Sequence, residues 1–136
     1  MNTETSLHRR RDRSPYGYED LTRFRVLLLD LREEQSKSLE DLTEAARRAI
    51  GESLGDLSSL PRHLGDRASD VNELSMSFAF LARAEAEMIE IDDALERIDN
   101  RSYGLCETCD RPIPMDRLLA IPMAKLCVSC KRAGER

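Results

Sequence analysis

All four cysteines of the sequence lie within 25 residues, at Cys106, Cys109, Cys127 and Cys130. They form two Cys-x-x-Cys pairs, separated by seventeen residues. The two-residue spacing lets both thiolates of a pair, and the backbone N–H groups that follow them, face one ion. Four sulfurs at about 2.3 Å suit a tetrahedral Zn²⁺ and fill its coordination sphere, which leaves no position for a reactive water. The pattern therefore predicts one structural zinc ion.

Other uses of four cysteines fit the sequence less well. Two disulfides would need an oxidising compartment, but the N-terminus has no apolar stretch of the kind a signal peptide requires. An iron site of the rubredoxin type uses similar cysteine pairs, but the aromatic surroundings usual for it are missing. Residues 101–136 are too few to fold on an apolar core alone, so we expect the metal to supply most of their stability.

Composition argues against several other classes of protein. Of the 136 residues, 35% are charged and 4% aromatic, which favours helices with narrow apolar seams over a large core. No apolar run is long enough to cross a membrane, and we expect a cytoplasmic protein. Histidine occurs only as His8 and His63, which leaves little material for His-based catalysis. We therefore expect that the protein is not an enzyme.

The charge of the chain is unevenly distributed. The net charge is −5, yet residues 1–17 and residues 101–136 are each net positive, so residues 18–100 are strongly acidic. Phosphate contacts need clustered Lys and Arg, which makes this middle region a poor ligand for DNA or RNA. The Arg-rich segment 1–17 is polar and aperiodic, and we expect a disordered tail there.

Two long segments without glycine or proline show helical periodicity. They cover residues 18–50 and about 66–100, and residues 51–65 between them contain three Gly and one Pro. The first apolar seam is expected at Leu21, Phe24, Leu28, Leu31, Leu42, Ala45 and Ala49. The second is expected at Leu74, Phe78, Leu81, Ala84, Met88, Ile91, Leu95 and Ile98, with one irregular step near Leu81. Phe80 lies two residues from Phe78 and is expected to be exposed.

Two helices of similar length joined by a breaker fold most simply as an antiparallel coiled-coil hairpin. Neither seam alone stabilises a helix in water, so a homodimer of long helices is the alternative, and we favour a monomeric hairpin because it explains the interruption. The predicted fold class is all-α with a small zinc finger. We divide the chain into a tail at 1–17, a hairpin at 18–100 with its tip at about 51–68, and a four-cysteine zinc-finger domain at 101–136.

A longer motif surrounds the cysteines. It reads Tyr103-Gly104-x-Cys106-x-x-Cys109, then Pro112-Ile113-Pro114, Arg117-Leu118, Pro122 and Cys127-x-x-Cys130-Lys131. Placed after an acidic helical segment, this motif resembles the DksA/TraR family of zinc-finger transcription regulators. The resemblance covers about residues 20–132. It implies a protein that binds RNA polymerase directly, with no sequence-specific DNA binding, and that inserts its coiled-coil tip into the secondary channel to act on initiation complexes.

The resemblance also implies which residues act at the tip. The family's tip carries Asp-x-x-Asp-x-Ala, whose second Asp and Ala correspond to Asp66 and Ala68, while His63 stands in place of the first Asp. In family members that respond to the alarmone ppGpp, basic residues help to form its site. The matching positions here are Glu90, Ile121 and Lys131, and only Lys131 is basic. Because Glu90 would repel a phosphate and Ile121 cannot bind one, we predict little ppGpp synergy.

Two other functions are weighed against this one. The basic ends of the chain could make the finger a module that binds nucleic acid directly, but four thiolates around Zn²⁺ add net negative charge and weaken that prediction. A thiol redox sensor, in which oxidation ejects the zinc, is the other alternative. Lys125, Lys131 and Arg132 lie near the cysteines and would support thiolate character.

Overall fold

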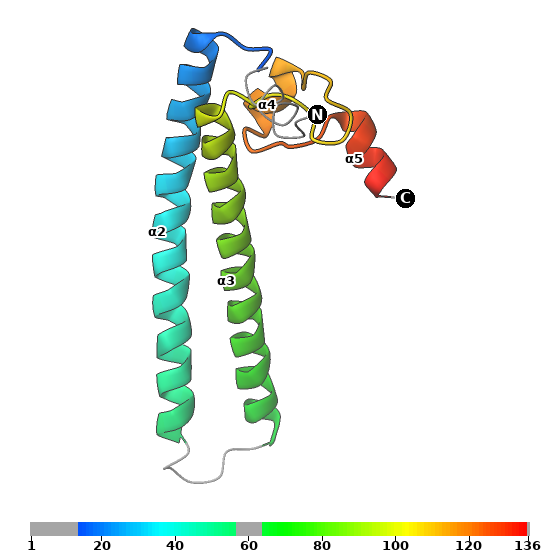
Figure 1. The fold of residues 1–136 in the computed structure, drawn as a ribbon. Coiled ribbons are helices and arrows are strands. Elements are labelled where there is room, and N and C mark those ends of the chain that lie inside the picture. The colour runs from blue at the N-terminus through cyan, green and yellow to red at the C-terminus, as the bar shows by residue number, and fades with distance from the viewer. Residues whose placement is uncertain (1–13, 57–63, 136) are drawn as a thin grey trace, which may run out of the picture. The chain divides into compact units, whose positions relative to one another are not determined.

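The computed structural model describes residues 14–56 and 64–135, and it describes side chains for residues 14–52 and 71–135. Within these ranges the regular structure is helical, apart from one isolated bridge between Leu105 and Pro112. The helices are α2 (Tyr18–Asp56), α3 (Leu64–Asp99), α4 (Met115–Ala120) and α5 (Val128–Gly134), as Figure 1 shows. None of these described helices combines the length and the apolar composition that a membrane crossing requires.

Both long helices extend further than the sequence predicted. Helix α2 continues through Gly51 to Asp56 instead of ending at residue 50, and α3 begins at Leu64 instead of about residue 66. The extension of α2 includes two glycines, Gly51 and Gly55. Each costs a helix interior only about 1 kcal/mol relative to alanine, and a helix of 39 residues tolerates that cost. The break between the helices is therefore shorter than expected. Of the predicted tip, residues 57–63 lie outside the described residues.

The chain forms two compact units, which divide both long helices. One unit comprises Met1–Arg32 and Ile89–Arg136, and the other comprises Glu33–Met88. The sequence analysis divided the chain at residue 100, whereas in the structure the finger shares its unit with the adjoining ends of α2 and α3. The reason is a common core, which contains residues of the helix ends and of the finger.

Within the first unit, the start of α2 packs against the end of α3. Phe24 and Leu28 of α2 belong to the same buried cluster as Ile91, Ala94 and Ile98 of α3. Two ion pairs fix the direction of the two segments: Arg25 contacts Asp99, and Arg32 Nε lies 2.7 Å from Asp92 Oδ1. From the first pair to the second, the chain advances seven residues along α2 but goes back seven residues along α3. These segments are therefore antiparallel, as predicted.

The seam of α3 is more regular than the sequence suggested. Its buried or partly buried positions between residues 74 and 84 are Leu74, Ser77, Leu81 and Ala84. These positions continue the heptad steps of three and four, so Ser77 occupies the seam position that we assigned to Phe78. Phe78 is 47% exposed, and its predicted place in the core was wrong because helix phase, not side-chain size, decides which residue faces inward. Phe80 is 52% exposed, as predicted.

One of the predicted seam residues of α2 is exposed in the structure. Ala46 is buried, at 4% exposure, whereas the predicted seam residue Ala45 is exposed. Both residues are alanines, so they differ only in the direction in which the helix turns their side chains. A sequence pattern with a polar interruption, such as the one that Gln35 causes here, does not fix that phase to one residue.

Residues 14–17, which the sequence analysis assigned to the tail, contact the finger. The Ser14 backbone N–H donates to Arg101 O at 2.7 Å, and the Ser14 hydroxyl donates to Tyr103 O at 2.6 Å. The Tyr16 hydroxyl donates to Ile113 O, and the Tyr16 ring lies edge-on to Phe24 with centroids 5.8 Å apart. Residues 14–17 therefore pack against the finger instead of belonging to the predicted tail, and the rest of that predicted tail, residues 1–13, lies outside the described residues.

Gly104 lets this segment approach the finger. Its φ is +88°, and a Cβ placed on it would lie 2.5 Å from the Tyr16 ring. Both the backbone conformation and the close approach exclude a side chain. The glycine of the sequence motif is therefore required by packing between residues 14–17 and the start of the finger.

Candidate zinc centre

The structure brings the four cysteines together. Their Sγ atoms all lie within 4.8 Å of one another, and Cys109 Sγ lies 3.8 Å from Cys127 Sγ. Four sulfurs at about 2.3 Å from a tetrahedral Zn²⁺ would be separated by about 3.8 Å. The cluster therefore has the size that a four-cysteine zinc site needs, with Cys106, Cys109, Cys127 and Cys130 as the residues that would hold the ion.

The first cysteine pair lies in a tight reversal of the chain. Cys106 O accepts a hydrogen bond from the Asp110 backbone N–H at 2.9 Å, and the Cys106 N–H donates to Arg111 O at 2.9 Å. Asp110 has a φ of 57°, in the left-handed region that closes such a turn. These bonds direct Cys106 and Cys109 toward one point.

The second pair uses the start of a helix for the same purpose. Cys127 is the N-cap residue of α5, and Cys130 follows in the first turn. The Lys131 backbone N–H donates to Cys127 O at 3.0 Å, which begins the helical bonding. A spacing of three residues places the two cysteine side chains on neighbouring positions of one helix face.

The surroundings of the thiols favour metal binding. Burial raises the pKa of Cys106, but backbone N–H groups, led by those of Cys127 and Cys109, bring it down to about 6. The Cys130 backbone N–H likewise lowers the pKa of Cys127. The neighbouring thiols raise the pKa of Cys130 to about 12. A dication held by the four sulfurs would favour the thiolate form of each, including Cys130, whose pKa the neighbouring thiols raise.

The finger packs on a buried apolar cluster that it shares with the ends of α2 and α3. Tyr103, Ile113 and Leu118 are fully buried, and they join the helix residues Phe24 and Ile98 in one cluster. The Tyr103 hydroxyl donates to Pro122 O at 2.7 Å, and burial raises the pKa of this phenol. Because Cys106 belongs to the same cluster, the cluster connects the metal site to the ends of α2 and α3.

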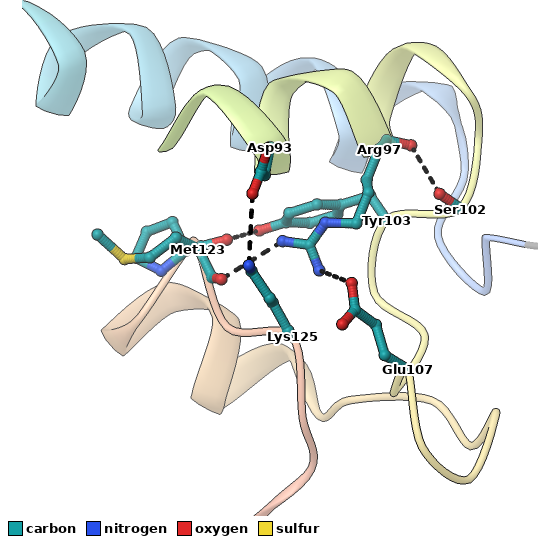
Figure 2. Close-up of polar contacts among 8 residues, drawn as sticks. Asp93, Arg97, Ser102, Tyr103, Glu107, Met123 and Lys125 are labelled. Atoms are coloured by element: carbon teal, nitrogen blue, oxygen red, sulfur yellow. Dashed lines mark hydrogen bonds and ion pairs between the residues drawn. The ribbon is translucent and has the colours of Figure 1, made fainter. Parts of the chain in front are cut away.

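Polar side chains also connect the finger to α3. Of these, only Lys125 was singled out from the sequence, and for a role near the cysteines instead of a contact with α3. Figure 2 shows Arg97 of α3 pointing toward Met123 and Glu107 of the finger, and Lys125 of the finger pointing toward Asp93 of α3. Arg97 in the last turn of α3 was the available signal, since a basic residue is favourable at a helix C-terminus. Its partners are distant in sequence and could not be recognised from spacing.

The tip residues that the resemblance implied fall at the start of α3. Asp66 and Ala68 lie in the first turns of this helix, whereas His63 lies outside the described residues. The side chains of residues 64–70 also lie outside the description, so the roles of Asp66 and Ala68 stay predictions.

The three positions matched to the alarmone site line one cavity. Glu90 of α3, Ile121 after α4 and Lys131 of α5 border a space of about 410 Å³ beside the finger. Arg117 and Lys125 also line it. The end of α3 and two neighbouring segments of the finger therefore bring these positions together, and the cavity mixes acidic and basic side chains.

Comparison with known proteins agrees with this geometry. The profile described as "Prokaryotic dksA/traR C4-type zinc finger" matches residues 101–136. The solved structure of transcription factor DksA2 from Pseudomonas aeruginosa is similar to 87% of this chain, over 84% of its own length, with 30% identity and a TM-score of 0.72. The chain belongs to the DksA/TraR family. Membership confirms the predicted fold class of coiled coil plus zinc finger, and it confirms zinc as the cofactor of this DksA/TraR protein.

Curated relatives support the same family. An uncharacterized protein of Aquifex aeolicus is 34% identical over 110 residues, which are 78% of this chain and 72% of that protein. The RNA polymerase-binding transcription factor DksA of Haemophilus influenzae is 30% identical over 96 residues, which are 71% of this chain and 66% of that protein. These alignments extend beyond the cysteines into the helical part of the DksA/TraR chain.

Proposed function

We propose that this chain is a transcription regulator that binds RNA polymerase directly. The observation that carries the proposal is the similarity to the RNA polymerase-binding transcription factor DksA of Haemophilus influenzae, which covers 71% of this chain. The similarity to transcription factor DksA2 extends over 84% of that structure and so includes the helices as well as the finger. The strongly acidic region 18–100 is consistent with a protein partner that presents basic surface, and it is a poor ligand for DNA. The four cysteines fill the metal's coordination sphere, so the proposal includes no catalytic step at the zinc.

The proposed mode of action is insertion of the coiled-coil tip into the secondary channel of the polymerase. Asp66 and Ala68 would act there, because they match the family's tip pattern and lie in the first turns of α3. A protein acting in this way would work as a monomer in the cytoplasm and would need no sequence-specific DNA contact. His63 stands where the pattern has an Asp, so a mechanism with two tip carboxylates on one Mg²⁺ would not apply here.

The first test measures binding of the zinc-loaded protein to core RNA polymerase in competition with a known secondary-channel factor. We expect competitive binding. Asp66→Asn should bind with an affinity close to that of the wild type but lose its effect on the lifetime of promoter complexes, because the carboxylate would act only after docking. Asp41→Asn, at an exposed position of α2, is the matched control and should behave like the wild type.

Failure of the zinc-loaded wild type to bind core polymerase would overturn the proposal. Salt-dependent binding to free duplex DNA in the same preparation would then favour the nucleic-acid module instead. Release of zinc by mild peroxide, coupled to a change in promoter response, would favour the thiol redox sensor.

We also propose that ppGpp contributes little to this regulator. The matched positions Glu90 and Ile121 supply no basic donor for a phosphate. The basic side chains that line the same cavity are balanced by an equal number of glutamates: Arg117, Lys125 and Lys131 against Glu90, Glu107 and Glu135. In an assay of promoter-complex lifetime, adding ppGpp to the regulator should leave its effect nearly unchanged. The polymerase without the regulator is the control for ppGpp acting elsewhere, and a several-fold ppGpp-dependent increase in the regulator's effect would contradict this prediction.

A further inference from the structure

Four charged residues connect the end of α3 to the finger in a reciprocal arrangement, which we call the junction clamp. Helix α3 supplies Asp93 and Arg97, one turn apart, and the finger supplies Glu107 and Lys125 (Figure 2). Arg97 Nη1 lies 4.0 Å from Glu107 Oε1, and Lys125 Nζ lies 3.4 Å from Asp93 Oδ2. Each element thus contributes one positive and one negative side chain, and each charge faces its opposite across the junction.

Arg97 is the member of the clamp whose position is most constrained. Its side chain is 12% exposed, whereas the other ion-paired side chains described in the structure are between 33% and 78% exposed. Its Nη2 donates to Met123 O at 3.3 Å, but its Nε and Nη1 have no hydrogen-bond partner among the described residues. Burying a guanidinium in this way costs free energy unless nearby negative groups offset it. The Met123 carbonyl and the Glu107 carboxylate offset part of this cost by direct contact, and the Asp93 carboxylate contributes through space.

The clamp is joined directly to the metal-binding segments. Glu107 follows the ligand Cys106, and Lys125 lies two residues before the ligand Cys127. The Glu107 backbone N–H donates to Lys125 O at 3.0 Å, so the two segments are paired at the positions whose side chains reach α3. A metal ion held by both cysteine pairs would cross-link these same two segments. Binding of the ion and alignment of Glu107 beside Lys125 would therefore favour each other.

We propose that Arg97 is a positioning residue for the zinc centre: through the junction clamp, it couples binding of the metal to docking of the finger on the end of α3. Coupling between two equilibria is reciprocal, so an interaction that the metal stabilises must in turn raise the affinity for the metal. Arg97 would act through Glu107 and Met123 and, because the Glu107 and Lys125 segments are paired, in concert with the ion pair between Lys125 and Asp93. The proposal concerns the zinc centre alone and does not depend on which partner the protein binds.

The test measures the zinc dissociation constant of the full-length protein by competition with a chelator of known affinity. Arg97→Gln should weaken zinc binding on the order of tenfold, the range found when groups outside the metal's own ligands are removed. Arg25→Gln is the matched control, because Arg25 also pairs with an acid across the helices, but its partner is Asp99 of α3 and its side chain is 44% exposed. The control should retain the wild-type constant. An unchanged constant for Arg97→Gln would overturn the proposal.

A double-mutant cycle separates positioning from general loss of stability. Glu107→Gln, Arg97→Gln and the double variant are compared by their zinc dissociation constants. If the two side chains act as a pair, the zinc dissociation constant of the double variant should be close to that of the single variant with the larger constant. If the two fold-changes multiply instead, the side chains act independently and the clamp is refuted.

A second pair of variants covers the case in which Arg97→Gln does not fold. Asp93→Asn and Lys125→Gln alter the other ion pair of the clamp, whose side chains are 46% and 33% exposed, and both variants should retain wild-type helix content by circular dichroism. Each should weaken zinc binding a few-fold, since partly exposed pairs contribute less. Wild-type zinc affinity in both folded variants would also overturn the proposal.

Discussion

Replacing Cys106 with serine is expected to weaken zinc binding more than about 100-fold and to unfold the finger. Substitutions outside the metal's own ligands already cost about 10- to 100-fold, and Cys106 is itself a predicted ligand. Its side chain is fully buried, so no water can take the place of the sulfur without opening the site. Zinc content after dialysis, measured by atomic spectroscopy, and the zinc dissociation constant check this prediction.

The spectroscopic consequence of Cys106→Ser should be local. Helices α4 and α5 have 6 and 7 residues, whereas α2 and α3 have 39 and 36, so helix content by far-ultraviolet circular dichroism should fall only slightly. The near-ultraviolet signal should change more, because Tyr103 is packed beneath the metal site. Thr108→Ser, which alters the exposed turn between two of the cysteines, is the control and should retain one zinc per chain. A Cys106→Ser protein that keeps one tightly bound zinc would contradict the assignment of Cys106 as a ligand.

Replacing Tyr103 with alanine is expected to lower the free energy of unfolding by about 3–5 kcal/mol, the range found for large aromatic side chains removed from a core. Tyr103 is fully buried, its ring lies 5.1 Å from the ring of Phe24, and its hydroxyl bonds to Pro122 O. It therefore joins α2, the end of α3 and the segment before the second cysteine pair. Urea unfolding of the zinc-saturated protein measures the effect.

Tyr103→Phe is the matched control for the packing contribution. It keeps the ring and removes only the bond to Pro122 O, so the loss should be about 1–3 kcal/mol, the cost of leaving one buried polar group without a partner. The difference between the two variants measures what the ring contributes. If Tyr103→Ala lost no more than Tyr103→Phe, the ring would contribute nothing to the shared core, contrary to the structure.

The sequence was most informative where the determining interactions are local. Two Cys-x-x-Cys pairs predict a metal site because two residues of spacing already direct both sulfurs of a pair toward one ion, and only the meeting of the two pairs needs the fold. The inward positions Phe24, Leu28, Ile91 and Ile98 follow from a periodicity that repeats over several turns. Local geometry and repetition were enough for both features.

Helix phase and helix length depended on tertiary packing. Ser77 occupies the seam where the larger Phe78 was expected, and Ala46 is buried where Ala45 was expected, because each helix adopts one rotation along its length. Helix α2 passes through Gly51, although glycine weakens a helix locally. Such choices depend on the sum of contacts along a helix and not on the preference of one residue.

The connections between the helices and the finger were decided by the tertiary structure alone. Segments that are distant in sequence are joined by the ion pair of Asp93 with Lys125, by the contacts of Ser14 and Tyr16, and by the cavity beside Glu90. No periodicity or spacing relates such segments, because their proximity results from packing on a shared core. The spacing of the cysteines and the apolar periodicity were enough to predict a four-cysteine zinc finger and two long helices with apolar seams. The packing of the finger on the ends of the helices decided which residues surround the metal site, because those residues meet only in the folded chain.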